Sequence, residues 1–241
     1  MPFALLSAAL VVLAAVCHRT GVLPFGPAFG LLAIGLLGAL VSLIRQSLRL
    51  WQVLTRRRQG RASPLVASLF VAGTVLAIPG GVVAMARLGS AGLPAIHDIS
   101  TDLANPPAFV DVLPLRAGAA NSAAYGGASV AAQQRQAYPA VRPVWLSMPP
   151  DDAFDRAMEA VVAMGWDIAG SNRAEGRIEA TATTFWFGFK DDVVIRLRPE
   201  ATGTRVDMRS VSRVGGGDVG ANASRIRRYL ARLGQDSRTR P

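Results

Sequence analysis

Three long apolar runs dominate the first 90 residues of the 241-residue chain. They cover residues 3–16, about 25–44 and about 65–86. The second and third are about 20 residues long and carry no charge, which suffices to cross a hydrocarbon core about 30 Å thick at about 1.5 Å per residue. Because lipid offers no hydrogen-bond partners, backbone groups must pair within each run, so the runs predict helices. We expect residues 1–90 to form a three-span transmembrane region.

The first apolar run is shorter than the other two, and it could be a retained helix or a cleaved signal peptide. No basic segment precedes it, and two further runs follow it. These two features favour a retained first span.

Arginine placement predicts how this region lies in the membrane. Residues 1–90 contain eight arginines and no acidic residue, and six of the eight lie between the second and third runs. Positive residues stay cytoplasmic, so this connection and the N-terminus are expected inside. We therefore expect a multi-pass protein of the bacterial inner (plasma) membrane, with the region after Arg87 in the periplasm or otherwise extracytoplasmic. The net charge of +10 comes mainly from the membrane region, which argues against a nucleic-acid partner.

The chain beyond the apolar runs divides into three parts. Residues 91–150 are rich in Pro, Ala and Gly and predict an extended collar with one short helix over about residues 128–137. Residues 151–234 carry the periodic patterns of a folded domain. Residues 235–241 predict a disordered tail.

The patterns within residues 151–234 predict an α+β domain. Apolar positions recur at helical spacing after Pro150 and again after Asp218, which is a good N-cap. Between these helices, four segments alternate apolar and polar residues as strands do: 166–169, 176–187, 192–198 and 204–213. Short turns join them, so we expect an antiparallel four-stranded sheet. Helices would cover one face of the sheet in a two-layer arrangement and leave the other face exposed to solvent (wet).

Several segments of the exported region occur in the order seen in one bacterial family. They are residues 96–102 (IHDISTD) with 105–107 (NPP), 125–127 (YGG), 183–192 (TTFWFGFKDD), 210–215 (SVSRVG) and 218–222 (DxGAN). In these segments the chain resembles the domain of unknown function 1499 (DUF1499) family, and some members carry a similar N-terminal block of membrane spans. The resemblance implies this type of domain but supplies no activity and no catalytic residue.

The densest group of ionisable side chains after the membrane region is His97, Asp98, Thr101 and Asp102. An imidazole held by a carboxylate could act as a base or bind a metal. One histidine and two aspartates fall short of a full ligand set, so we predict no metal site. The alternative is structural, with the aspartates bonded to backbone amides in a turn.

Aromatic residues gather at the end of the second predicted strand. Phe185 and Phe187 are expected to point one way and Trp186 the other. One interpretation places these rings in the core. The other places Trp186, beside Lys190, in the lipid interface or along an apolar ligand groove.

The sequence Lys190, Asp191 and Asp192 could form a general-base or ion-binding cluster, or simply a hairpin turn. The exposed strand face carries alternating charges, which cross-strand ion pairing explains. The second interpretation of this face is a basic groove for an anionic envelope component. These charged residues are Arg177, Glu179, Arg196, Arg198, Arg205, Asp207 and Arg209.

Two classes of function remain. The favoured class is a non-enzymatic envelope module, a domain tethered to the lipid bilayer that binds an envelope protein, or an apolar or lipid ligand, near the membrane surface. No catalytic constellation and no cofactor motif supports an enzyme. The alternative is an envelope hydrolase that uses His97 with nearby carboxylates. Convergence of His97, Asp98 and Asp102 with Lys190, Asp191 and Asp192 in one pocket would favour chemistry.

Overall fold

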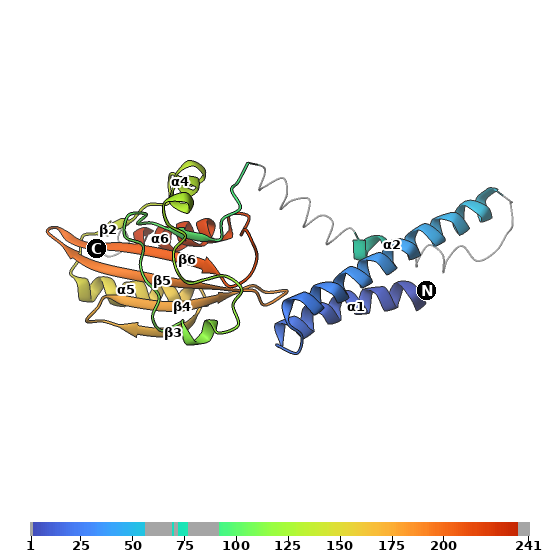
Figure 1. Cartoon of the computed structure of the whole chain (residues 1–241), viewed down its shortest axis with the longest axis horizontal. Coiled ribbons are helices and arrows are strands. Elements are labelled where there is room, and N and C mark those ends of the chain that lie inside the picture. The colour runs from blue at the N-terminus through green and yellow to red at the C-terminus, as the bar shows by residue number, and fades with distance from the viewer. Residues whose placement is uncertain (1, 56–68, 70–71, 77–91, 236–241) are drawn as a thin grey trace. The chain divides into compact units, whose positions relative to one another are not determined.

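The computed structural model describes residues 2–55, 69, 72–76 and 92–235, in two compact units (Figure 1). The first unit comprises Met1–Gly89 with Phe185–Gly188, and the second comprises Ser90–Thr184 with Phe189–Pro241. The described part of the first unit is mainly helical, and the second unit contains the sheet.

Helices α1 (Pro2–Arg19) and α2 (Phe25–Thr55) pack against each other through small residues. A Cβ atom added at Gly35 would lie 2.9 Å from Cγ2 of Val11 and 3.1 Å from the backbone oxygen of Ser7, so the close approach requires glycine. Other small residues buried in this unit include Ala4, Ala14, Ala28 and Ala39. Large apolar side chains are exposed instead, among them Leu6, Val12, Ile34 and Leu37. This distribution is typical of helices that pack within lipid.

One helix among the described residues is long and apolar enough to cross a membrane. It is the part of α2 from Phe25 to Arg49, whereas the apolar part of α1, Phe3–Arg19, is shorter. The first two predicted runs are therefore helical, but only the second has the length of a span. The third predicted run, residues 65–86, lies almost entirely outside the described residues. The described part of the chain thus supports one candidate span where the sequence predicts three.

The second unit contains a six-stranded antiparallel sheet, so the prediction of four strands is wrong in number. The predicted strands are present, each paired with the next, as β3 (Asp167–Asn172), β4 (Arg177–Thr183), β5 (Lys190–Glu200) and β6 (Gly203–Ser212). Two additional strands, β1 (Asp98–Ser100) and β2 (Val144–Leu146), come from the predicted collar and both pair with β6. Each has only three residues, which is too short for a recognisable alternation.

Helices α5 (Pro150–Ala163) and α6 (Ala221–Gln235) cover one face of the sheet, as predicted (Figure 1). Tyr229 of α6 is fully buried, and its hydroxyl donates a hydrogen bond to the backbone oxygen of Ala157 at 2.9 Å. Its ring stacks on Trp166 with the centroids 5.5 Å apart. Alternate strand residues complete this core: Ile178, Ala180, Val193, Ile195, Val206 and Met208.

The opposite face of the sheet, predicted to be wet, is covered by the collar (Figure 1). Phe109 and Val112 pack on Val194 and Val211 of the sheet. The prediction of a two-layer domain is wrong in this respect, because a loop adds a third layer. Its packing partners lie far away in sequence, so no local pattern could indicate the contact.

The collar also contains two short helical segments, η1 (Pro114–Arg116) and α4 (Gly127–Ala137), the second at the position predicted for a short helix. A buried carboxylate holds the collar in place. Glu179 of β4 is fully buried and accepts hydrogen bonds from the backbone amides of Val110 at 2.8 Å and Val112 at 3.0 Å. A buried amide needs a partner, and here one side chain satisfies two of them.

Candidate functional site

A layer of arginine–carboxylate pairs lies between the sheet and the collar. Asp207 of β6 is fully buried and accepts hydrogen bonds from Arg196, Arg198 and Arg205 at 2.9–3.1 Å. Asp102, from the loop after β1, accepts hydrogen bonds from the same three guanidinium groups at 3.1–3.3 Å. Three positive and two negative charges leave this cluster with one net positive charge. The predicted cross-strand ion pairs are present, and the collar adds Asp102 to them.

The loop backbone also fixes the Asp102 carboxylate. Burial acts to raise the pKa of Asp102, but hydrogen bonds from the amides of Asn105 and Ala104 and the charge of Arg205 lower it by more. The pKa therefore lies below its usual value. Asp102 is ionised at neutral pH and acts as a fixed counter-charge to the arginines.

Asp98 forms a second buried pair with Arg209. The contact is bidentate, with Nε to Oδ1 at 2.8 Å and Nη2 to Oδ2 at 2.7 Å. The same guanidinium group lies over the rings of Phe109 and Tyr125, 5.0 and 5.3 Å from their centroids. It also donates a hydrogen bond to the backbone oxygen of Ala123 at 2.7 Å. The Asp98 carboxylate thus helps to attach the collar to β6.

Asp192 lies inside β5, so the predicted hairpin turn over residues 190–192 is wrong. It is fully buried and accepts hydrogen bonds from Arg213 at 2.8 Å, from Thr181 at 2.7 Å and from Arg116 of η1. Burial acts to raise the pKa of Asp192, but the hydrogen bonds from Arg213 and Thr181 and the charge of Arg213 outweigh it and hold the pKa below its usual value.

Asp191 belongs to a buried polar network beside α6, on the helix-covered face of the sheet. It pairs with Arg225 of α6. Asn222, one turn earlier in α6, donates hydrogen bonds to Oγ of Ser212 at 2.9 Å and to the backbone oxygen of His97 at 3.0 Å. These contacts attach the start of α6 to the strands below it.

The predicted residues around His97 do not assemble into one site. Nδ1 of His97 is buried without a hydrogen-bond partner, and within the described residues no hydrogen bond joins its ring to a carboxylate. Thr101 accepts a hydrogen bond from the backbone amide of Met208 at 2.9 Å through Oγ1, which continues the pairing of β1 with β6. Asp98 and Asp192 share the collar-covered face, but each is already paired with its own arginines.

The aromatic segment forms the turn between β4 and β5, residues 184–189. The amide of Thr184 donates to the backbone oxygen of Phe189, and the amide of Phe189 donates to Oγ1 of Thr184, both at 2.9 Å. Phe185 and Trp186 are each 75% exposed, and their rings meet edge to face with the centroids 5.3 Å apart. The predicted strand up to residue 187 therefore ends earlier, and Phe185 lies outside the core. Phe187 is half-buried.

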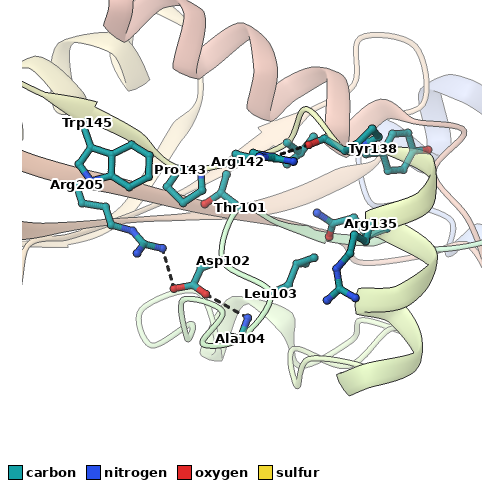
Figure 2. Close-up of a pocket in the computed structure, with 13 residues that line it drawn as sticks. Thr101, Asp102, Leu103, Ala104, Arg135, Tyr138, Arg142, Pro143, Trp145 and Arg205 are labelled. Atoms are coloured by element: carbon teal, nitrogen blue, oxygen red, sulfur yellow. Dashed lines mark hydrogen bonds and ion pairs between the residues drawn. The ribbon is translucent and has the colours of Figure 1, made fainter.

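A groove of about 470 Å³ lies where β1 and β2 separate along β6 (Figure 2). Its charged residues are Asp102 of the loop after β1, Arg135 of α4, Arg142 of the segment leading into β2, and Arg205 of β6. Trp145 of β2 is 60% exposed and lines one end, with the Arg205 guanidinium carbon 5.7 Å from the ring centroid. Arginine and an exposed aromatic ring thus converge on one concave surface.

Arg135, Arg142 and Trp145 are absent from the sequence-predicted candidates. They lie in a collar without periodicity, and they approach Arg205 only through the pairing of β2 with β6. One signal is available in the sequence: a tryptophan with arginine and proline nearby in an otherwise Ala- and Gly-rich segment.

These features define an α+β domain whose sheet carries two helices on one face and, on the other, a loop layer joined to the strands by arginine–carboxylate pairs. Residues 98–233, from β1 into α6, match the family described as Protein of unknown function (DUF1499). The match covers more than half of the chain, so the chain belongs to this family. No curated protein matches the chain.

Proposed function

We propose that this protein is a membrane-anchored envelope protein whose exported α+β domain binds the lipid surface through the turn of residues 184–189. The observation that carries the proposal is the exposure of Phe185 and Trp186 at this turn. Tryptophan is enriched at membrane–water interfaces, and burying a phenylalanine side chain is favourable by about 1.5–3 kcal/mol. Lys190, which is exposed at the start of β5, adds a positive charge suited to anionic headgroups.

The helical unit supports the anchor. Its large apolar side chains are exposed around an interface of small residues, an arrangement that is unfavourable in water and favourable in lipid. We propose that residues 1–90 cross the inner (plasma) membrane three times with the N-terminus in the cytoplasm, on the basis of the arginine-rich connection between the second and third runs. The α+β domain is then extracytoplasmic.

The alternative function, an envelope hydrolase acting through His97, has weaker support. A general base needs a carboxylate or imidazole placed to take a proton from a substrate. Asp98, Asp102, Asp191 and Asp192 are each held in arginine ion pairs. Among the described residues, the feature that favours this alternative is the buried Nδ1 of His97, which has no hydrogen-bond partner there.

The lipid-binding proposal is tested by tryptophan quenching. The full chain is reconstituted in nanodiscs with phospholipid brominated near the top of the acyl chains, which quenches only nearby tryptophans. The measured quantity is the tryptophan emission that is lost to the brominated lipid. We expect this loss to be smaller in Trp186→Phe than in the wild type. We expect it to be unchanged in Trp145→Phe, because Trp145 is an exposed tryptophan at the far end of the sheet. Equal quenched emission in the wild type and Trp186→Phe would overturn the proposal.

A second measurement separates a lipid from a protein partner. A photo-crosslinking amino acid is placed at position 186 of the full chain in cells, with the same amino acid at the exposed position 168 of β3 as a control. Lipid adducts at position 186 alone support the proposal. A discrete protein adduct at position 186 in place of lipid would instead favour a protein partner at this turn.

A further inference from the structure

Hydrogen bonds join the walls of the groove beside α4. β1 pairs with β6 at Arg209–Val211 and β2 pairs with β6 at Thr204–Val206, so the chain must leave the sheet edge between these points and return to it. Helix α4 belongs to the segment that connects them. Gln134 of α4, fully buried, accepts a hydrogen bond from the amide of Ser100 at 2.9 Å and donates one to its backbone oxygen at 2.6 Å. The helix and the sheet edge are therefore joined, and a ligand would meet a preformed surface.

The charge of the groove is positive and only partly compensated. Arg205 already shares Asp102 with two other arginines. Arg135 has no ion pair with any described residue, and Arg142 donates a hydrogen bond to the backbone oxygen of Pro139 at 2.9 Å but has no carboxylate partner within the same residues. Both side chains are exposed. Two guanidinium groups are thus free to bind an anion.

Apart from Thr101 and Gln134, the uncharged lining is mainly apolar and includes a flat aromatic surface. Figure 2 shows Trp145 and Arg205 at one end, Arg135 at the other, and Pro143 with Arg142 between them. Val141, which also lines the groove, belongs to the buried core. The volume of about 470 Å³ falls within the range of about 300–1,000 Å³ typical of small-molecule sites.

We infer that this groove binds a soluble aromatic carboxylate. The guanidinium fork of Arg135 or Arg142 matches a planar carboxylate, and the ring of the ligand would pack on Trp145. A neutral aromatic molecule would leave the arginines uncompensated, and a bare inorganic anion would leave the tryptophan exposed. The two features together select a molecule that carries both groups.

The position of the groove favours a soluble ligand over a lipid headgroup. Arg205 pairs with Arg198 near the end of β5 that is distant from Lys190. Eight residues of strand separate these two positions, which corresponds to about 26 Å at about 3.3 Å per residue. If the 184–189 turn meets the membrane, as proposed above, the Trp145 end of the groove lies well away from the lipid surface. Only the choice between soluble ligand and lipid rests on the proposed function.

The inference is tested by isothermal titration calorimetry of the full chain in nanodiscs with 2-naphthoate as the probe and empty nanodiscs as the blank. We expect saturable binding that weakens at least tenfold in the Arg135→Gln/Arg142→Gln double variant and at least tenfold in Trp145→Ala. The neutral analogue 2-naphthalenemethanol should bind at least tenfold more weakly than 2-naphthoate. The matched control is Arg228→Gln/Arg232→Gln, which removes the same charge from exposed positions of α6 and should leave binding unchanged.

Three results would overturn the inference: heat no greater than that of empty nanodiscs, equal affinity in the wild type and both groove variants, or equal affinity for the neutral analogue. All substituted residues are exposed, so the variants are expected to fold. Near-ultraviolet circular dichroism checks this, because the stacked rings of Trp166 and Tyr229 in the core contribute to the signal. Because the readout is a soluble probe at the groove, its failure is distinct from failure of lipid quenching at Trp186.

Discussion

Gln134 and Ser100 form a closed pair in which one side-chain amide satisfies both backbone groups of a strand residue. The distances are 2.9 Å from the Ser100 amide to Oε1 and 2.6 Å from Nε2 to the Ser100 oxygen. The side chain imitates the next strand of the sheet at the point where β1 would otherwise be an open edge. It therefore protects β1 from pairing with another chain.

Replacement of Gln134 by leucine should destabilise the domain. Both backbone groups of Ser100 would lose their partner in a buried environment, at a cost of about 2–4 kcal/mol in the free energy of unfolding. The matched control is Gln133→Leu, because Gln133 is the exposed neighbour on the same helix. Urea unfolding of the full chain in non-ionic detergent, followed by circular dichroism, measures both. Equal stability of the two variants would contradict this assignment.

Glu179→Gln should loosen the collar while the helix-covered core stays intact. A glutamine has a single acceptor oxygen, so its amide group would face the N–H of Val110 or Val112. We expect a loss of about 3 kcal/mol and faster hydrogen exchange over residues 105–116. Hydrogen-exchange mass spectrometry checks this, with Glu175→Gln as control because the Glu175 side chain is 58% exposed. Uniformly faster exchange across α5 and α6 would show that Glu179 supports the whole domain instead.

The lowered pKa of Asp192 predicts a loss of stability in acid. A carboxyl whose folded pKa lies below its unfolded value of about 3.9 stabilises the fold above that value. The stabilisation disappears as the pH falls through the folded pKa, so the loss should appear below about pH 4. The free energy of unfolding of Asp192→Asn at pH 7 should be lower by about 3–5 kcal/mol. Its stability should also fall less steeply than that of the wild type as the pH drops below about 4. Thermal unfolding at several pH values from 3 to 7 measures the pH dependence of stability in the wild type and the variant. The control is Asp155→Asn, at an exposed ion pair, which should lose stability in acid as steeply as the wild type does.

Asp218 should affect the pH dependence of stability in the direction opposite to that of Asp192. Burial raises its pKa, and the charge of Asp191 adds to this, although the amides of Asn222 and Gly220 lower it in part. The folded protein therefore holds its proton more tightly than the unfolded chain does, and stability should fall as the pH rises from about 4 through the folded pKa. Asp218→Asn should remove this downward slope. An unchanged slope would mean that another group titrates there.

Gly35→Leu should separate α1 from α2. The added side chain would overlap the backbone of Ser7 and the side chain of Val11, whereas Gly30 on the same helix has open space around its Cβ position. Spin labels at the exposed positions Leu6 and Leu37, in a Cys17→Ser background, report the interhelical distance. We expect a longer and broader distance distribution in Gly35→Leu and an unchanged one in Gly30→Leu. Unchanged distances in both would contradict close packing at Gly35.

The long strands and the two covering helices could be predicted from the sequence because each carries its own periodicity. The β5 and β6 strands are 11 and 10 residues long and carry apolar residues at alternate positions within residues 192–198 and 204–213, and Asp218 marks the start of the last helix. The end of β4 could not be predicted, because the aromatic residues 185–187 are of the type favoured in strands. The hydrogen bonds between Thr184 and Phe189 end the strand instead.

The polar layer and the groove depend on contacts that no local pattern records. Alternation along β6 predicts that Arg205 and Asp207 share a face, but not that a loop about 100 residues earlier supplies Asp102 to the same cluster. The contact of Trp145 with Arg205 could not be predicted either, because it depends on the pairing of the three-residue strand β2 with β6. Sequence periodicity therefore predicts which face is polar, and tertiary contacts decide what covers it.

The pairing of β1 with β6 has a consequence for the order in which the domain forms. Asp98 and Arg209 are separated by 111 residues, so the first strand to be synthesised finds its neighbour among the last. Closing so long a loop is slow, because the entropy of the intervening chain is lost before the contact is gained. Strands β1 and β2 must then stay unpaired until β6 has emerged. A chain stopped before residue 203 would contain both edge strands and no strand for either to join.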